Sequence, residues 1–353
     1  MRAQNPIPAG IWVAILAAVT FGATTPFIKR AAGHTGAFFT AAFLYAGAAA
    51  ASAVFSLRSA EHEAPVRRRH VPRLVAVALV GAVFAPACFA WGLARTSATE
   101  ASLLLNFEAP FTVACAALLY REHVDRKVAA GIACITLGGV VLVLGGGSAG
   151  AVSIAGTLAI VAATLGWALD NTLTRPLADL NPSTVVLGKA LVGATLSLVV
   201  GAVAMESLPS GPSGLVLLAC GAAGYGLSLR LYLLAQRRIG AARTASIFAG
   251  APLVGALSSW AFGEPAPTAF TLAAAALFLI GARLHIGEDH DHEHTHAALE
   301  HEHAHSHDDG HHDHLHAEGL SPGAGEHSHA HRHDETTHAH PHAPDAHHRH
   351  VHR

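Results

Sequence analysis

The stretch that decides the fold is SATEASLLLNFEAPFTVACAALLYREHV, at residues 97–124, because its pattern occurs a second time. The second copy reads ARTASIFAGAPLVGALSSWAFGE, at residues 242–264. A shift of 142 residues places Ala109-Pro110 over Ala251-Pro252 and Glu122 over Glu264. Each copy is an apolar helix with Ala-Pro in its middle and a glutamate just past its end. The chain is therefore expected to contain one helical unit twice.

Apolar runs of helical length surround both copies. About 20 apolar residues cross a bilayer as a helix, and ten such runs lie at residues 9–28, 36–57, 74–94, 99–120, 128–145, 153–174, 183–205, 213–235, 242–262 and 266–285. Only 13% of the residues are charged, against roughly a quarter in soluble domains. The alternation of a membrane barrel is absent. We predict an all-α integral membrane protein with ten transmembrane helices.

The ten runs divide into two sets of five, residues 1–145 and residues 146–285. A weaker match places Phe21-Gly22 over Leu165-Gly166 at a shift of 144 residues. Because five is an odd number, the second set enters the membrane from the opposite side. Inverted repeats of this kind are typical of secondary transporters that work by alternating access.

The loops indicate how the chain is oriented. Cytoplasmic loops of membrane proteins carry an excess of Lys and Arg. If the N-terminus is cytoplasmic, the loops on that side hold Arg58, Arg67, Arg68, Arg69, Arg73, Arg121, Arg126, Lys127, Arg175, Arg237 and Arg238. The opposite loops hold only Lys29, Arg30 and Arg95. We predict a multi-pass protein of a bacterial-type inner (plasma) membrane, with both termini in the cytoplasm.

The quoted motifs and the two sets of five runs resemble the EamA-type transporters of the drug/metabolite transporter superfamily, over residues 9–285. The resemblance implies a ten-helix fold with a central substrate cavity. It also implies export of small metabolites or drugs, commonly in exchange for protons or another substrate. The chain carries no nucleophile–base set and no phosphate-binding loop, so we do not expect an enzyme.

Ionisable residues inside a membrane are costly and mark functional sites, and Glu108 is the first candidate. It lies in the middle of the fourth run, two residues after Asn106 and two before Pro110. Proline removes a helical hydrogen bond and frees the carbonyl of residue 106. A carboxylate beside this break suits a proton or cation site, and Pro252 marks the matching break. The alternative is a structural hydrogen bond to a neighbouring helix.

A second group of candidates lies in the sixth, seventh and eighth runs, and comprises Asp170, Asn171, Lys189 and Arg230. The three charged members lie at similar depth, which allows an Asp170–Lys189 or an Asp170–Arg230 pair. Such a pair either lowers the cost of inserting the charges or serves as a gate or substrate contact.

The tail, residues 286–353, is a separate region. Residues 285–353 hold 24 of the 28 histidines and no Phe, Trp or Tyr, so we expect disorder. Alternate residues of an extended chain face the same way, and imidazole binds zinc, nickel, cobalt and copper. The expected metal ligands are His290, His292, His294, His296, His301, His303, His305, His307, His312, His314, His316, His327, His329, His331 and His333.

Our leading hypothesis is a secondary transporter that exports a small organic solute by alternating access and needs no cofactor. The expected partners are the solute, the lipid bilayer and divalent metal ions on the tail, without nucleic acid. A homodimer is left open. Two alternative functions also stay open, namely efflux of a divalent transition metal or its chelate, and a membrane-anchored metal sensor or store.

Overall fold

The computed structural model describes most of the apolar part of the chain and four segments of the tail. The described residues are 6–58, 65–120, 126–145, 153–177, 180–239, 244, 247–286, 290–296, 299–305, 327–333 and 336–342.

The first half of the apolar region is a series of helices, several of which are interrupted. Its elements are α1 (Pro6–Gly22), α2 (Thr25–Ala31), α3 (Ala37–Arg58), η1 (Arg68–His70), α4 (Val71–Ala78), η2 (Leu79–Phe84), α5 (Ala85–Leu93), α6 (Ala98–Leu104), η3 (Leu105–Phe107), α7 (Glu108–Tyr120) and α8 (Arg126–Leu144). Because α4, η2 and α5 follow one another directly, they form one continuous rod, and α6, η3 and α7 form another.

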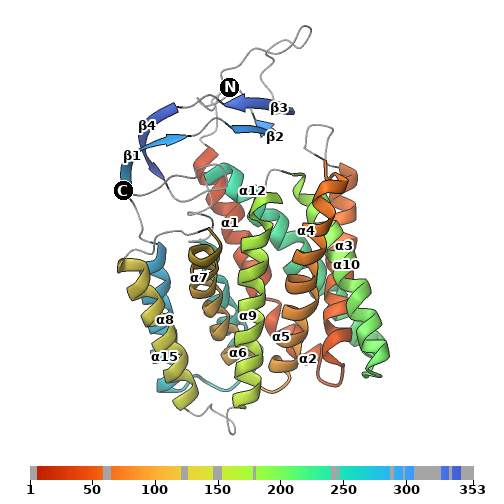
Figure 1. The fold of residues 1–353 in the computed structure, drawn as a ribbon. Coiled ribbons are helices and arrows are strands. Elements are labelled where there is room, and N and C mark those ends of the chain that lie inside the picture. Colours follow the sequence, from red (N-terminus) through yellow and green to blue (C-terminus); the bar gives the residue numbers. More distant parts are fainter. Residues whose placement is uncertain are drawn as a thin grey trace.

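The second half repeats this series. Its described elements are α9 (Ile154–Thr174), η4 (Arg175–Leu177), α10 (Pro182–Val203), α11 (Gly211–Cys220), η5 (Gly221–Leu227), α12 (Ser228–Ile239), α14 (Ala251–Ala261) and α15 (Ala269–Ile286). Figure 1 shows the helices of both halves side by side in one bundle.

Eight of the described helical segments are long and apolar enough to cross a membrane. The ninth and tenth expected runs correspond to α14 and α15, which are shorter in the described residues. Large apolar side chains cover the outside of the bundle, including Leu57, Leu118 and Val203, each at least 79% exposed. An apolar surface of this extent is unfavourable in water. The chain is therefore a multi-pass membrane protein.

Two of the rods contain a π-helix in their middle. These are η2, between α4 and α5, and η5, between α11 and α12, and their first residues are 142 positions apart. This is the same shift that aligns the two Ala-Pro motifs. At η5 the helices approach so closely that a Cβ on Gly221 would overlap the Leu44 carbonyl oxygen. The two halves therefore share a backbone feature that hydropathy does not reveal.

Helix contacts between the halves occur in matched pairs. The α3 helix packs on α10, α8 on α15, and α6 on α14, so each of these helices meets the one in the corresponding position of the other half. The contact of α1 with α12 is matched by that of α9 with α5. The core between them is formed by buried apolar residues of both halves, such as Leu44, Phe89, Leu217 and Phe278.

The tail contains four strands, β1 (His290–His296), β2 (Leu299–His305), β3 (His327–His333) and β4 (Thr336–His342). They pair as two antiparallel sheets, β1 with β4 and β2 with β3. An alternating sequence fits the period of a strand, and the disorder expected for residues 286–353 stays a prediction. His307, His312, His314 and His316 lie outside the described residues.

Candidate transport site

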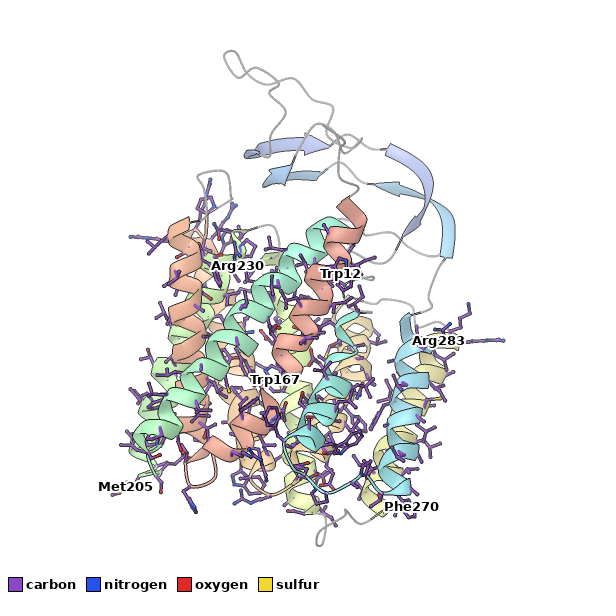
Figure 2. All side chains as sticks on the ribbon, turned by 180° about the vertical axis from the view of Figure 1, so that it is seen from behind. Trp12, Trp167, Met205, Arg230, Phe270 and Arg283 are labelled. Atoms are coloured by element: carbon purple, nitrogen blue, oxygen red, sulfur yellow. The ribbon has the colours of Figure 1, made fainter. Side chains whose placement is uncertain are left out.

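The middle of the bundle is filled by aromatic side chains from both halves. Phe21 of α1 lies at its centre, with ring centroids 6.5 Å from Trp167, 5.7 Å from Tyr225 and 5.6 Å from Phe248. Figure 2 shows Trp167 at mid-height in the bundle. Tyr45 adds a further ring, 5.5 Å from that of Tyr225. This aromatic cluster gives the centre of the bundle an apolar wall with polar edges.

The π-helix η2 supplies this cluster with a hydrogen-bond acceptor. The Tyr45 hydroxyl donates to the carbonyl oxygen of Gly81 at 2.6 Å, and Trp167 Nε1 donates to the same oxygen at 3.2 Å. A π-helix displaces the regular backbone hydrogen bonds, and such turns are frequent at functional sites. The carbonyl therefore fixes two aromatic side chains from two other helices.

A buried ion pair lies beside the same turn. Asp170 and Lys189 are 4% and 8% exposed, and their side chains form a salt bridge. The Thr174 hydroxyl also donates to Asp170 Oδ1, at 3.3 Å. A Cβ on Gly81 would overlap Asp170 Cγ, so glycine is required at this position. Breaking such a pair would leave one charge without a partner in a low-dielectric environment, which is strongly destabilising.

Of the two pairings that the sequence allowed, the structure contains the one with Lys189. Arg230 lies elsewhere, with its guanidinium over the Phe55 ring at 4.5 Å from the centroid. Its Nε also donates to Ser183 Oγ at 3.4 Å. These contacts place Arg230 between α3, α10 and α12.

Glu108 and Asn171 form the accessible part of the site. Asn171 Nδ2 donates to Glu108 Oε1 at 2.7 Å, and this joins the start of α7 to α9. Asn171 is exposed and Glu108 is partly exposed, whereas the neighbouring Asp170 is buried. Glu108 also interacts electrostatically with Asp170 and Lys189. Asp170 and Asn171 are consecutive but make different contacts. Asp170 forms the buried ion pair with Lys189, and Asn171 donates a hydrogen bond to Glu108.

Asn106 does not share in this contact. It is 7% exposed, and its amide donates to the Leu103 carbonyl oxygen at 2.9 Å, inside its own rod. It belongs to the 3₁₀ turn η3, which interrupts the rod directly before Glu108. Pro110 follows in the first turn of α7, and Pro252 stands in the first turn of α14. Both prolines therefore begin a helix, where a missing amide hydrogen is tolerated.

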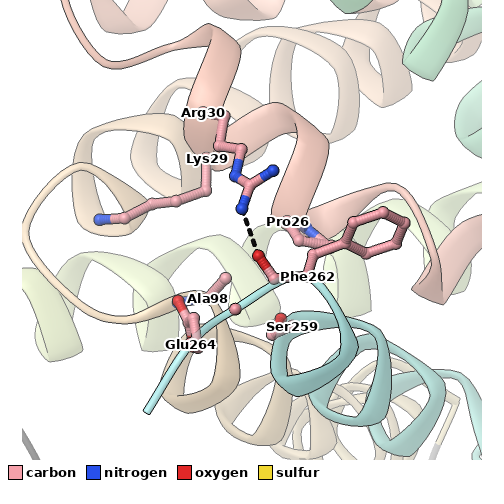
Figure 3. A pocket seen from close by; sticks show the side chains of 8 residues that line it. Pro26, Lys29, Arg30, Ala98, Ser259, Phe262 and Glu264 are labelled. Carbon is pink, nitrogen blue, oxygen red and sulfur yellow. Dashed lines mark hydrogen bonds between the residues drawn. The ribbon is translucent and has the colours of Figure 1, made fainter.

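Hydrogen bonds close the end of the bundle at which α2 ends and α6 begins. Lys29 Nζ donates to the carbonyl oxygens of Leu93 and Thr96, at 2.5 and 2.6 Å. Arg30 donates to the Phe262 carbonyl oxygen, as Figure 3 shows. The small cavity between these residues, of about 200 Å³, is lined by Pro26, Lys29, Arg30, Ala98, Ser259, Phe262, Gly263 and Glu264.

Two glutamates complete this closed end. Glu264 accepts hydrogen bonds from the Ala98 and Thr99 amides at 2.6 and 2.9 Å, and from the Thr99 hydroxyl at 2.6 Å. Glu206 accepts from the amides of Phe38 and Phe39 at 2.8 and 3.2 Å. In both cases a residue of the second half caps a helix of the first half, so the carboxylates join the halves. Glu122, the repeat partner of Glu264, lies outside the described residues.

Sequence comparison identifies the family. The sequence model of the EamA-like transporter family matches residues 8–144 and matches a second time at residues 154–286. The chain belongs to the EamA-like transporter family. The two matched segments contain the central site and the closed end, whereas the tail strands follow the second segment.

Two further similarities agree with this membership. A protein described as an uncharacterized transporter, from Methanothermobacter thermautotrophicus, is 31% identical over 211 residues. The match covers 57% of this chain and 60% of that protein, so it leaves part of each outside the comparison. A crystal structure that is 20% identical has a TM-score of 0.59 and covers 78% of this chain and 95% of the other. At that identity the likeness concerns the fold.

The structure brings together four of the residues that the sequence singled out, Glu108 with Asn171 and Asp170 with Lys189. It places Asn106 and Arg230 in other contacts. Sequence reasoning missed the contacts of Tyr45 and Trp167 with Gly81, because an aromatic residue in an apolar run carries no sign of its partner. Within the described part of the chain, no group of three or more His, Cys, Asp or Glu residues is placed to hold a metal ion.

Proposed function

We propose that this EamA-like protein exports a small organic solute across a bacterial-type inner membrane by alternating access. It does so with ten transmembrane helices in two inverted sets of five, and with both termini in the cytoplasm. Family membership supports transport as the general activity. The solute class, the direction and the mechanism rest on the arguments that follow.

The inverted arrangement is supported by the way the halves match. The helix contacts between the halves occur in corresponding pairs. The two π-helices begin 142 residues apart, at the same spacing as the two Ala-Pro motifs. A duplication with an odd number of spans places equivalent helices in opposite orientations, as alternating access requires.

The observation that carries the proposal is the contact of Glu108 with Asn171, at 2.7 Å. An ionised carboxylate only accepts hydrogen bonds, whereas a protonated one also donates. Protonation of Glu108 would therefore weaken its hold on the Asn171 amide, which is exposed and could then donate to a solute instead. The aromatic cluster around Phe21 would contact the apolar part of such a solute.

The closed end supports loading of the solute from the other end. Lys29 joins α2 to the end of α5, Arg30 joins α2 to the end of α14, and Glu264 joins that end to the start of α6. In the proposed orientation this end faces away from the cytoplasm. A transporter in this state would take up its solute from the cytoplasmic side, as export requires, and opening would break these hydrogen bonds.

The proposal is tested by profiling organic solutes in the medium of cells that express the wild-type chain, Glu108→Gln or Glu100→Gln. Glu100 is a matched control, since it is a carboxylate of the same rod that caps the Ser97 amide at its end. We expect at least one solute to accumulate outside cells with the wild-type and Glu100→Gln chains and not with Glu108→Gln. Equal export by Glu108→Gln, or no solute above the empty-vector level, would contradict the proposal.

The same cells distinguish metal efflux from solute export. Cellular zinc, nickel and cobalt are measured alongside the solutes. If the wild-type chain lowers the content of one metal and Glu108→Gln abolishes this effect, the cargo is the metal or its chelate and the proposal of an organic solute is wrong.

A further inference from the structure

The centre of the bundle carries an excess of negative charge. The carboxylate of Asp170 is neutralised by its salt bridge to Lys189, whereas the carboxylate of Glu108 accepts a hydrogen bond from the neutral amide of Asn171. Two carboxylates and one ammonium sum to one negative charge. Arg230 makes its contacts between α3, α10 and α12. A ligand with one positive charge would therefore balance the centre while Glu108 is ionised.

Tyrosine side chains from three elements lie near this charge. Glu108 interacts electrostatically with Tyr45 of α3, Tyr225 of η5 and Tyr232 of α12. An interaction of this kind weakens with distance, so the three tyrosines share the surroundings of the carboxylate. The aromatic cluster and the carboxylate thus belong to one site, to which both halves of the chain contribute.

Three rings of this site are open to a ligand. Phe248 lies between the other two, with its ring centroid 5.0 Å from that of Tyr232 and 5.6 Å from that of Phe21. All three residues are partly exposed. The interplanar angles of 74° and 43° turn the rings in different directions. A ligand at Glu108 would therefore meet both faces and edges of aromatic rings.

A carboxylate together with aromatic rings recognises an organic cation. The face of an aromatic ring attracts a cation, and quaternary ammonium ligands are bound in aromatic cages in this way. An ionised carboxylate has about four acceptor positions, so the bond from Asn171 leaves room on Glu108 for a ligand. An anionic solute would be repelled by Glu108, and a neutral solute would gain neither attraction.

We propose that the solute is an organic cation, an amine or quaternary ammonium compound whose charged group binds at Glu108 and whose apolar body packs against these three rings. This inference rests on the proposed function and names the class of its solute. Protonation of Glu108 would end the ionic attraction as it frees the Asn171 amide. The solute would then exchange an ionic contact for a hydrogen bond on its way out.

Three probes that share a benzyl group separate charge from apolar contact. They are benzyltrimethylammonium, which is a cation, N-benzylacetamide, which is neutral, and phenylacetate, which is an anion. The dissociation constant of each probe is measured by equilibrium dialysis against the purified full-length chain in detergent, with binding to detergent alone subtracted. The buffer is mildly alkaline, so that carboxyl groups are ionised. The wild-type chain is compared with Glu108→Gln, Phe248→Leu and the control Glu100→Gln.

We expect the wild-type chain to bind the cation at least tenfold more tightly than the neutral probe, a difference of about 1.4 kcal/mol, and to bind the anion most weakly. Glu108→Gln should remove this preference and retain the neutral probe, which shows that the site is still folded. Phe248→Leu should weaken binding of the cation about threefold, because it removes one aromatic face. Glu100→Gln should bind all three probes like the wild-type chain.

Two results would overturn the inference. One is a wild-type chain that does not prefer the cation, a result that needs no variant to fold. The other is a Glu108→Gln chain that binds the cation as tightly as the wild-type chain does.

The solute profiles separate this inference from the proposed function. If the exported solute is neutral or anionic, the inference is wrong and export stands. If the chain exports no solute but binds benzyltrimethylammonium through Glu108, the proposal of export is wrong and the cation site stands.

Discussion

The two Ala-Pro breaks of the bundle occupy corresponding positions of the repeat and differ in chemistry. Glu108 precedes the first break and accepts a hydrogen bond from Asn171, whereas Gly250 precedes the second. Around the second break, Phe248 packs against Phe21 and Tyr232, with centroids 5.6 and 5.0 Å apart. The repeated helical unit therefore has a carboxylate at this position in its first copy and aromatic rings near it in its second copy. A charge is stable inside a membrane only where a partner is placed to receive it.

The largest expected effect comes from the ion pair next to the first break. Lys189→Met leaves Asp170 buried without its partner, and we expect the free energy of unfolding to fall by about 3–5 kcal/mol. Denaturation of the purified protein in detergent measures this change.

The double variant Asp170→Asn with Lys189→Met is the control for this prediction. It removes both charges, so we expect it to recover part of the lost stability. If the two substitutions simply add, or if Lys189→Met is neutral, the pair does not stabilise the protein in the way the geometry indicates.

The carboxylate at the first break is tested by a single substitution. Glu108→Gln replaces the charged acceptor of the Asn171 hydrogen bond by a neutral one, and a hydrogen bond to a charged group is worth about 1.5–3 kcal/mol, or about ten- to a hundredfold in rate. We expect export of the solute found by profiling to slow by this factor. The initial rate of export from loaded cells measures it.

The combined variant Glu108→Gly with Gly250→Glu exchanges the residues that precede the two breaks, and so tests whether the breaks are equivalent. The described surroundings of the second break are aromatic, with Phe21 and Tyr232 beside Phe248, so we expect a carboxylate moved to position 250 to give no recovery of export. Export at the wild-type rate would show that the two breaks are interchangeable, and that the comparison between them has no functional meaning.

The smallest expected effect concerns the closed end, where the second half caps the first. Glu264→Gln removes the charge that faces the start of α6, and loss of a helix cap costs about 1 kcal/mol. We expect a slightly lower melting temperature, together with faster reaction of Ala98→Cys with a membrane-impermeant thiol reagent in a cysteine-free background.

Glu100→Gln serves as the control at the same helix start. Glu100 caps the Ser97 amide within its own helix and does not join the halves, so the reaction of Ala98→Cys should be unchanged. An equal effect of both substitutions would mean that the α6 start is sensitive to any change and that Glu264 has no special part in closure.

Much of the candidate site is visible in the sequence, but only as a set of residues. Glu108, Asp170, Asn171 and Lys189 stand out because polar residues are rare in apolar runs. Their pairing is not visible, since Lys189 and Arg230 are equally plausible partners for Asp170 by depth. The carbonyl of Gly81 is hidden altogether, because every residue has a carbonyl and only the π-helix makes this one available to aromatic side chains of other helices.

The sequence by itself determined the membrane class, the duplication and the family, because bilayer thickness imposes run length and composition, and both are read along the chain. It also determined the period of the histidines in the tail. Only the tertiary structure decided which charges meet and which residues of the two halves are joined by hydrogen bonds. These properties depend on distances between residues far apart in sequence, such as Glu264 and Ala98 or Asp170 and Lys189, and packing sets those distances.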